Sequence, residues 1–186
     1  MKKIFVLAIV VVVVSAVWIT GLYPVAIVGG SPILYRAWDE AKEAAKRFAD
    51  AESRSAGGKP IDFSRQENAE MLKSIGRDAL NYLIEDKIFQ QEGERLASDF
   101  SLLVRERVGD ALKEGKDVEN AARLVYGLNL NDFRRVVLTP QAHAEVIQEI
   151  LLKRNQDFGE WLSQEKKSKS VRLLFVPYQW NGEAVR

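Results

Sequence analysis

The chain contains no cysteine and only one histidine among its 186 residues. The absence of cysteine excludes disulfides, thiolate metal sites and cysteine nucleophiles, and the single His143 excludes any site built from several histidines. Charge of one sign is not in excess either, because 27 Lys and Arg residues face 26 Asp and Glu residues. A balanced chain lacks the strongly basic face that duplex nucleic acid requires. Composition therefore removes much catalytic chemistry, and we expect no metal, no cofactor and no nucleic-acid partner.

Long apolar runs are confined to the N-terminus. Residues 4–23 carry no charge and follow Lys2 and Lys3. A helix of that length extends about 30 Å, enough to cross the hydrocarbon core of a bilayer, and the two lysines predict a cytoplasmic N-terminus. The sequence thus predicts a single-pass anchor in the cell membrane over residues 1–23, with residues 24–186 on the extracytoplasmic side.

A cleaved signal peptide is the competing interpretation of the same run. Lys2 and Lys3 would be its charged start, residues 4–14 its apolar centre and residues 14–16 its cleavage site. The apolar run continues past Ala16, which favours an uncleaved anchor. Both interpretations place the remaining chain across the membrane.

Two apolar segments at opposite ends of the remaining chain predict strands. Residues 25–28 are rich in β-formers and precede Gly29-Gly30, a pair that suits a two-residue hairpin turn. Residues 171–176 form a second such run, which ends at Pro177. Because an isolated hairpin is marginal in water, we expect residues 171–176 to join it as a third strand.

The residues between these strands have helical periodicity and predict a mainly α-helical domain. Gly76 and Gly93 each cost a helix roughly 1 kcal/mol relative to alanine, so either glycine permits a bend or an early end in the long second helix. Residues 166–170 are polar and predict a flexible connector. The predicted helices span residues 35–51, 64–96, 102–113, 118–126, 132–138 and 141–164.

The order of these elements, together with three motifs, resembles the N-terminal domain of the SurA/PrsA-type chaperones. Residues 25–33 are similar to the family's VAxVNGxxI opening and residues 83–93 to its LIxxxLLxQxA helix. Residues 126–134 are similar to its GLsxxxFR turn into the next helix. The ordered set covers most of residues 25–165.

The departures from the family limit what the resemblance implies. Gly29 stands where the family has Asn, and residues 97–99 replace its usual helix exit. The family's peptidyl-prolyl isomerase (parvulin) domain has no counterpart, since only 22 residues follow Gln164. The resemblance therefore implies a SurA-N-like helical domain over residues 24–186, with a small sheet of an N-terminal hairpin and a C-terminal strand, and no enzymatic activity.

The function that the resemblance implies is that of a holdase-type chaperone. We expect a membrane-anchored, extracytoplasmic protein that binds unfolded or newly exported polypeptides and is held at the membrane by residues 4–23. The alternative is a structural or assembly partner that uses the same fold to dock one folded neighbour in an envelope complex.

Aromatic side chains mostly fall on core-facing stripes, and most of them are expected to fill the core. Some would line an open groove between the first, second and last helices, because a receptor for unfolded chain needs a broad apolar surface. No residue is expected to be catalytic, and His143 is expected to be an ordinary surface or cap-region histidine. The candidate client-binding residues are Tyr35, Trp38, Tyr82, Phe89 and Trp161.

Overall fold

The computed structural model describes residues 18–186 and confirms the mainly helical class, with 67% of the residues in helices and one three-stranded antiparallel sheet. The sheet consists of β1 (Pro24–Val28), β2 (Ser31–Leu34) and β3 (Val171–Leu173) in the order β2-β1-β3. Gly29 and Gly30 join β1 to β2 with φ values of 55° and 86°. Both positions of the turn therefore need the positive φ that glycine adopts without strain.

The C-terminal strand pairs with β1, as the sequence predicts. Ala26 lies opposite Leu173, and the Leu174 amide donates a 2.8 Å hydrogen bond to the Val25 carbonyl. The strand ends three residues earlier than predicted, because Phe175 adopts a φ of 56° and turns the chain out of the sheet. Both ends of the described chain thus meet in one small sheet.

The predicted single-pass membrane anchor over residues 4–23 and the localisation derived from it are contradicted. None of the helices described over residues 18–186 has the length and apolar character needed to cross a bilayer. Residues 4–17, and the cleavage site considered at residues 14–16, lie outside the described residues.

Residues 18–23 belong to the folded domain. The chain turns at Gly21, whose φ is 66°, and the Arg36 amide donates a 3.0 Å hydrogen bond to its carbonyl. The Tyr23 ring stacks on Tyr35 with their centroids 5.0 Å apart. The last residues of the predicted span therefore pack against the start of the first helix.

Seven α-helices are described between the hairpin and β3, with one 3₁₀ turn and two π-helical segments among them. In chain order the elements are α2 (Tyr35–Ser55), η1 (Gln66–Asn68), α3 (Ala69–Leu96), α4 (Phe100–Glu114), α5 (Val118–Ala121), η2 (Ala122–Tyr126), α6 (Leu130–Phe133), η3 (Arg134–Leu138), α7 (Thr139–Lys153) and α8 (Phe158–Ser168).

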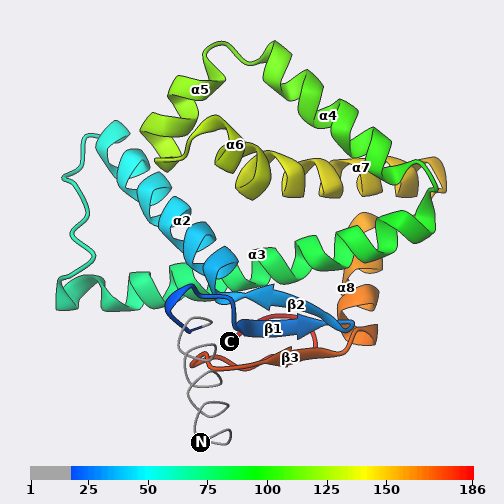
Figure 1. Ribbon diagram of the computed structural model, residues 1–186, viewed down its shortest axis with the longest axis horizontal. Coiled ribbons are helices and arrows are strands. Elements are labelled where there is room, and N and C mark those ends of the chain that lie inside the picture. Colours follow the sequence, from blue (N-terminus) through cyan, green and yellow to red (C-terminus); the bar gives the residue numbers. More distant parts are fainter. Residues whose placement is uncertain (1–17) are drawn as a thin grey trace, which may run out of the picture.

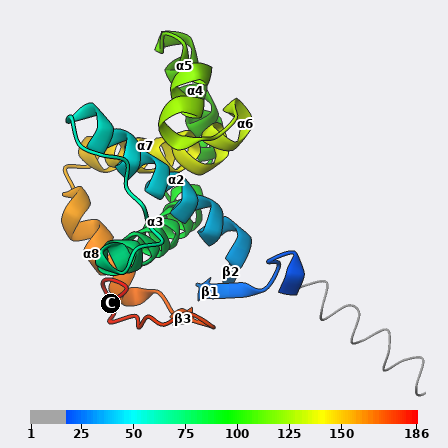
Figure 2. The same cartoon turned by 90° about the vertical axis from the view of Figure 1, so that its left-hand side faces the viewer.

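The long helix α3 divides the molecule (Figure 1). The sheet lies on one side of it, α2, α6 and α7 lie on the other, and α4 and α5 are farthest from the sheet. The view from the side shows the same layers, with α8 descending from α7 toward the sheet (Figure 2).

Two hydrophobic cores share α3. The first joins the sheet to α2 and the middle of α3, and includes Val25, Trp38, Leu80 and Ile84. The second joins the C-terminal half of α3 to α4 and α7, and includes Phe89, Phe100, Val104, Ile147 and Leu151.

The predicted helix over residues 141–164 is in fact two helices. Asn155 adopts a left-handed φ of 55° after α7, and the Asp157 side chain then accepts a 2.8 Å hydrogen bond from the Glu160 amide to cap α8. Asparagine tolerates this conformation better than most residues, which explains why the helix ends there.

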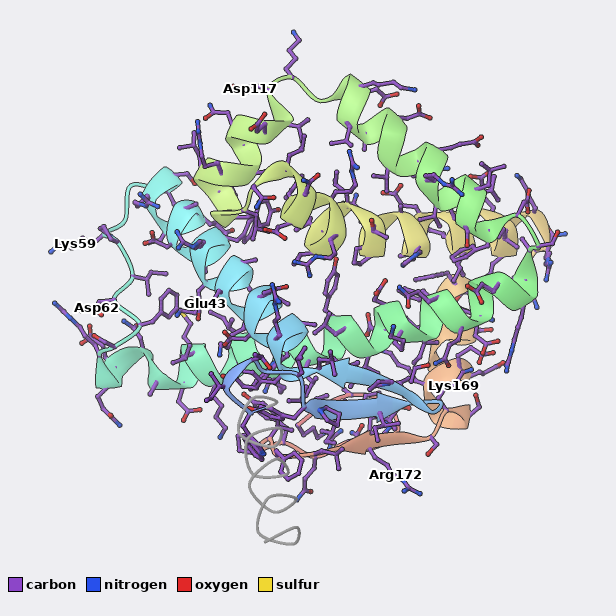
Figure 3. The ribbon with its side chains drawn as sticks, in the orientation of Figure 1. Glu43, Lys59, Asp62, Asp117, Lys169 and Arg172 are labelled. Carbon is purple, nitrogen blue, oxygen red and sulfur yellow. The ribbon has the colours of Figure 1, made fainter. Side chains whose placement is uncertain are left out.

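Residues 166–170 are not the predicted flexible connector. Residues 166–168 complete α8, where Lys166 forms an ion pair with Glu85. Lys169 forms a second ion pair with Glu92, and both side chains are nearly buried. Figure 3 shows Lys169 at the turn between α8 and β3. These pairs fix the end of the chain against α3.

Neither Gly76 nor Gly93 ends α3, which is continuous from Ala69 to Leu96. Each glycine allows close approach of a neighbouring side chain. A Cβ at Gly76 would lie 2.7 Å from the Tyr178 hydroxyl, and the Trp38 indole donates a 2.7 Å hydrogen bond to the Gly76 carbonyl. A Cβ at Gly93 would lie 2.3 Å from the ring of Phe100. α3 keeps glycine at both positions because a larger side chain would collide with a packed neighbour.

Gly93→Ala should therefore lower the free energy of unfolding by about 1–2 kcal/mol, because overpacking outweighs the gain in helix propensity. Gly109→Ala in α4 is the matched control: no atom lies within 4 Å of its added methyl group, so stability should rise by about 0.5–1 kcal/mol. Urea denaturation of both variants measures the two changes. A stabilised Gly93→Ala protein would contradict the packing argument.

Candidate functional site

Three of the described cavities border the gap between α3 and the helical run opposite it. That run is continuous from α6 through η3 to α7, over residues 130–153. Its central segment η3 is π-helical, and so is η2, which precedes α6. Single π-helical segments interrupt regular α-helices and occur frequently at functional sites.

The largest of these cavities, here called the apolar groove, has a volume of about 570 Å³. α2, α3, η2 and η3 form its walls, and it opens beside the exposed rings of Phe48 and Tyr82. The lining residues are Ala41, Ala44, Ala45, Phe48, Ile75, Asp78, Ala79, Tyr82, Tyr126, Val136 and Val137.

A second cavity, the Phe89 cavity, continues along α3 and has a volume of about 430 Å³. It shares Tyr82 and Val137 with the apolar groove, so the two spaces adjoin. The remaining lining residues come from α3, α7 and α8 and are Glu85, Asp86, Phe89, Pro140, Gln141, Ala144, Phe158 and Leu162.

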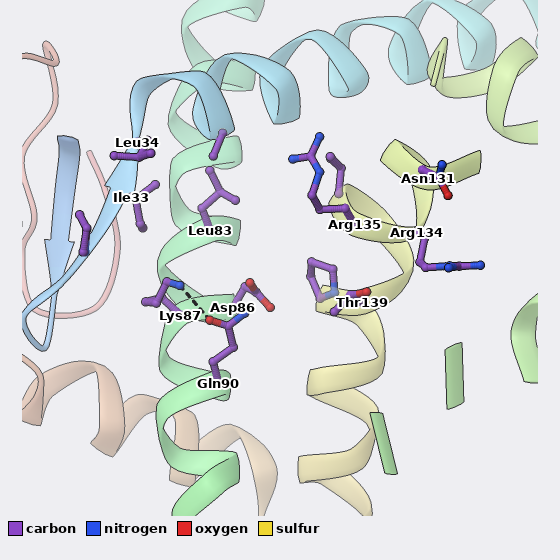
Figure 4. A pocket seen from close by; sticks show the side chains of 14 residues that line it. Ile33, Leu34, Leu83, Asp86, Lys87, Gln90, Asn131, Arg134, Arg135 and Thr139 are labelled. Carbon is purple, nitrogen blue, oxygen red and sulfur yellow. Dashed lines mark hydrogen bonds between the residues drawn. The ribbon is translucent and has the colours of Figure 1, made fainter. Parts of the chain in front are cut away.

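A third cavity of about 400 Å³ lies toward the hairpin (Figure 4). Ile33, Leu34 and Leu83 give it apolar surface from β2 and α3. Its three cations offer little to a ligand. Arg134 points away from α3 in the close-up, Arg135 forms a 2.7 Å ion pair with Glu40, and Lys87 donates a 2.8 Å hydrogen bond to Gln90. We therefore do not assign a binding role to this cavity.

A tyrosine forms one polar bridge across the gap. The Tyr82 hydroxyl lies 3.3 Å from the Val136 carbonyl and 3.4 Å from the Val137 carbonyl, and its single proton is shared between them in a long, bifurcated hydrogen bond. Desolvation, followed by the nearby charge of Asp86, raises the pKa of Tyr82 well above its usual value. The hydroxyl consequently stays neutral and remains a donor at physiological pH.

A buried histidine forms the second bridge, which corrects the expectation of a surface or cap-region His143. Its side chain is only 8% exposed, and its Nδ1 lies 2.6 Å from the Asp86 carboxylate. The imidazole also stacks on Phe100 with centroids 5.6 Å apart. The bridge ties α7 to α3 and is enclosed by packing, so it is a structural contact of the second core.

The structure separates the five predicted client-binding residues. Tyr82 and Phe89 line cavities, although Phe89 is itself buried. Trp161 stacks on Phe89 at 6.3 Å and packs against the second core. Tyr35 and Trp38 pack in the first core beside the sheet. The predicted set thus does not form one surface.

Several groove residues were missed because their role depends on distant neighbours. Phe48 stacks on Tyr126 with centroids 5.5 Å apart, although 78 positions separate them in the chain. The alanines at positions 41, 44 and 45 keep the α2 wall flat. Their spacing, with Phe48 one turn further on, is the sequence signal that could have marked this face of α2.

Comparisons of the chain with protein-family models, with curated proteins and with solved structures give no match. The resemblance to the SurA/PrsA-type chaperones therefore rests on the sequence motifs and the order of elements, and it enters the function only as part of a proposal.

Tyr82→Phe should remove the hydroxyl bridge and lower the free energy of unfolding by about 0.5–1 kcal/mol, since the bridge is one long, bifurcated hydrogen bond. Tyr126→Phe is the matched control in the same groove, because its hydroxyl has no hydrogen-bond partner recorded among residues 18–186, and stability should stay within about 0.3 kcal/mol. Thermal denaturation compares the two variants. Equal losses would show that the Tyr82 hydroxyl bridge contributes nothing.

Proposed function

We propose that this protein is a holdase-type chaperone that binds apolar segments of unfolded polypeptides in the apolar groove. The observation that carries the proposal is the groove itself, a space of about 570 Å³ whose lining is largely alanine, valine, isoleucine and aromatic side chains. The sequence resemblance to SurA/PrsA-type chaperones supports the same function. The proposal includes no prolyl isomerisation and no other covalent step.

The groove is not filled by the C-terminal segment of the chain. Tyr178, Trp180 and Val185 pack against the first core on the sheet side of α3, where the Tyr178 hydroxyl donates a 3.0 Å hydrogen bond to the Lys73 carbonyl. The groove lining includes no residue after Val137. The described part of the chain therefore leaves this apolar surface accessible to a client.

The chemistry of the lining suits a client without a fixed sequence. Apolar side chains gain roughly 25 cal/mol for each Å² that they remove from water, whatever their identity. Phe48, Tyr82 and Tyr126 add aromatic surface at the opening, and the two tyrosines also carry hydroxyls. Transient burial in this groove lowers the free concentration of aggregation-prone chain by mass action.

Suppression of client aggregation tests this function. The purified protein at several-fold molar excess should delay light scattering by a denatured model client, whereas Phe48→Ser should weaken the delay by at least about threefold. Leu152→Ser is the matched control: this leucine is 73% exposed on α7 and lies outside the groove lining, so its loss should leave the delay unchanged. No delay by the unmodified protein would refute the holdase function.

A second candidate function, an assembly partner for one folded protein, is favoured by a different observation. Phe175 is 71% exposed although its backbone adopts the left-handed φ of 56° that bulky residues rarely occupy. Trp18 packs edge-on against it at 5.7 Å, and Ile19 and Leu22 are exposed nearby in the chain. Trp18 and Phe175 thus present exposed apolar surface that lies outside the groove lining.

Crosslinking distinguishes the second candidate from the first. A docked neighbour should give one stoichiometric crosslinked product, and Phe175→Ser should abolish it while leaving aggregation suppression intact. Under the holdase proposal, Phe48→Ser should weaken aggregation suppression and leave the crosslinked product unchanged. Many products of heterogeneous size, unaffected by Phe175→Ser, would count against the assembly role.

A further inference from the structure

The charged residues that line the apolar groove and the Phe89 cavity all have the same sign. Asp78 lines the groove, and Glu85 and Asp86 line the cavity. The described lining of these two spaces contains no Lys, Arg or His. Among the residues that line these two spaces, the charged ones are therefore all carboxylates, and the cations that pair with them lie outside the lining.

Intramolecular contacts hold each carboxylate in place. Arg77 lies 3.1 Å from Asp78, whose side chain is nevertheless 60% exposed. Glu85 forms its ion pair with Lys166 across the gap to α8, and Asp86 is held by His143. Asp78 and Glu85 keep enough exposure to accept further hydrogen bonds from a ligand, whereas Asp86 is nearly enclosed.

The two more exposed carboxylates lie on one face of α3. Lining positions of this face run from Ile75 to Phe89, fourteen residues or about 21 Å of helix, which is the length of about six residues of extended chain. Asp78 and Glu85 are seven residues apart, about 10 Å. This distance corresponds to three positions of an extended chain in the polyproline-II conformation, which has three residues per turn and therefore places side chains three positions apart on the same side.

From this spacing we infer that the groove and the Phe89 cavity together bind an extended apolar segment of about six residues that carries two basic side chains about three positions apart. The lysine or arginine side chains would pair with Asp78 and Glu85 while the apolar side chains occupy the two cavities. An acidic segment would face like charge at both places. The inference rests on the proposed holdase function and specifies its client.

Three fluorescent peptides of about ten residues test the client class. They share the same leucine, phenylalanine and valine residues and carry two lysines, two glutamines or two glutamates at the same positions, three apart. Fluorescence anisotropy with the purified protein should rank lysine above glutamine above glutamate. Exposed ion pairs contribute little individually, so we expect the lysine peptide to bind roughly fivefold more tightly than the glutamate peptide, with the ratio falling at high salt.

Asp78→Asn should reduce the ratio of the affinities for the lysine and glutamate peptides by about half. Asp110→Asn, which removes an equivalent exposed carboxylate from α4, should leave this ratio unchanged. Glu85→Gln provides a second variant, checked by circular dichroism because it also breaks the ion pair with Lys166.

Equal affinity for the three peptides would overturn the inference and leave the holdase function standing. Absence of binding by all three would count against both. An unchanged ratio in Asp78→Asn would show that the preference arises elsewhere.

Discussion

The pairing of β3 with β1 is the constraint on which the rest of the molecule depends. It places β1 in the centre of the sheet, where Val25, Ala26 and Val28 are completely buried. The buried ion pair between Lys169 and Glu92 holds the same end of the chain to α3 just before β3 begins. An ion pair this enclosed is costly to break, because the remaining partner would keep an uncompensated charge. The chain end therefore fixes α8, and through α8 the second core, relative to the sheet.

The groove remains open because its two walls belong to different parts of this arrangement. α2 is packed in the first core, whereas η3 on the opposite side continues into α7, which is packed in the second. Between the cores, α3 and the opposite helical run are joined by the Tyr82 hydroxyl and by the pair of His143 and Asp86. Small side chains on α2 leave the space beside the Tyr82 bridge unfilled. The open groove is thus a consequence of where the polar bridges and the alanines lie.

Local sequence signals predicted the sheet well and the groove poorly. The hairpin depends on two adjacent glycines, and the third strand on a β-prone run that a hairpin needs for stability, so both can be read from short segments. The roles of Gly93, His143 and Phe48 depend instead on Phe100, Asp86 and Tyr126, which other helices supply. A pattern within one helix shows which face is apolar. It does not show whether a partner helix covers that face or leaves it open.

A client in the groove would couple its own binding to the stability of the protein. The groove touches α2 and α3, which build the first core, and η3, which leads into α7 and the second core. A segment that fills it would replace the missing contact between these walls and would bind only when both cores are assembled. Any ligand that binds the native state alone stabilises it by mass action. The bound client should thus hold together the walls of the gap, which are otherwise joined by two polar bridges. Release of the client should return the protein to its unbound state without any chemical step.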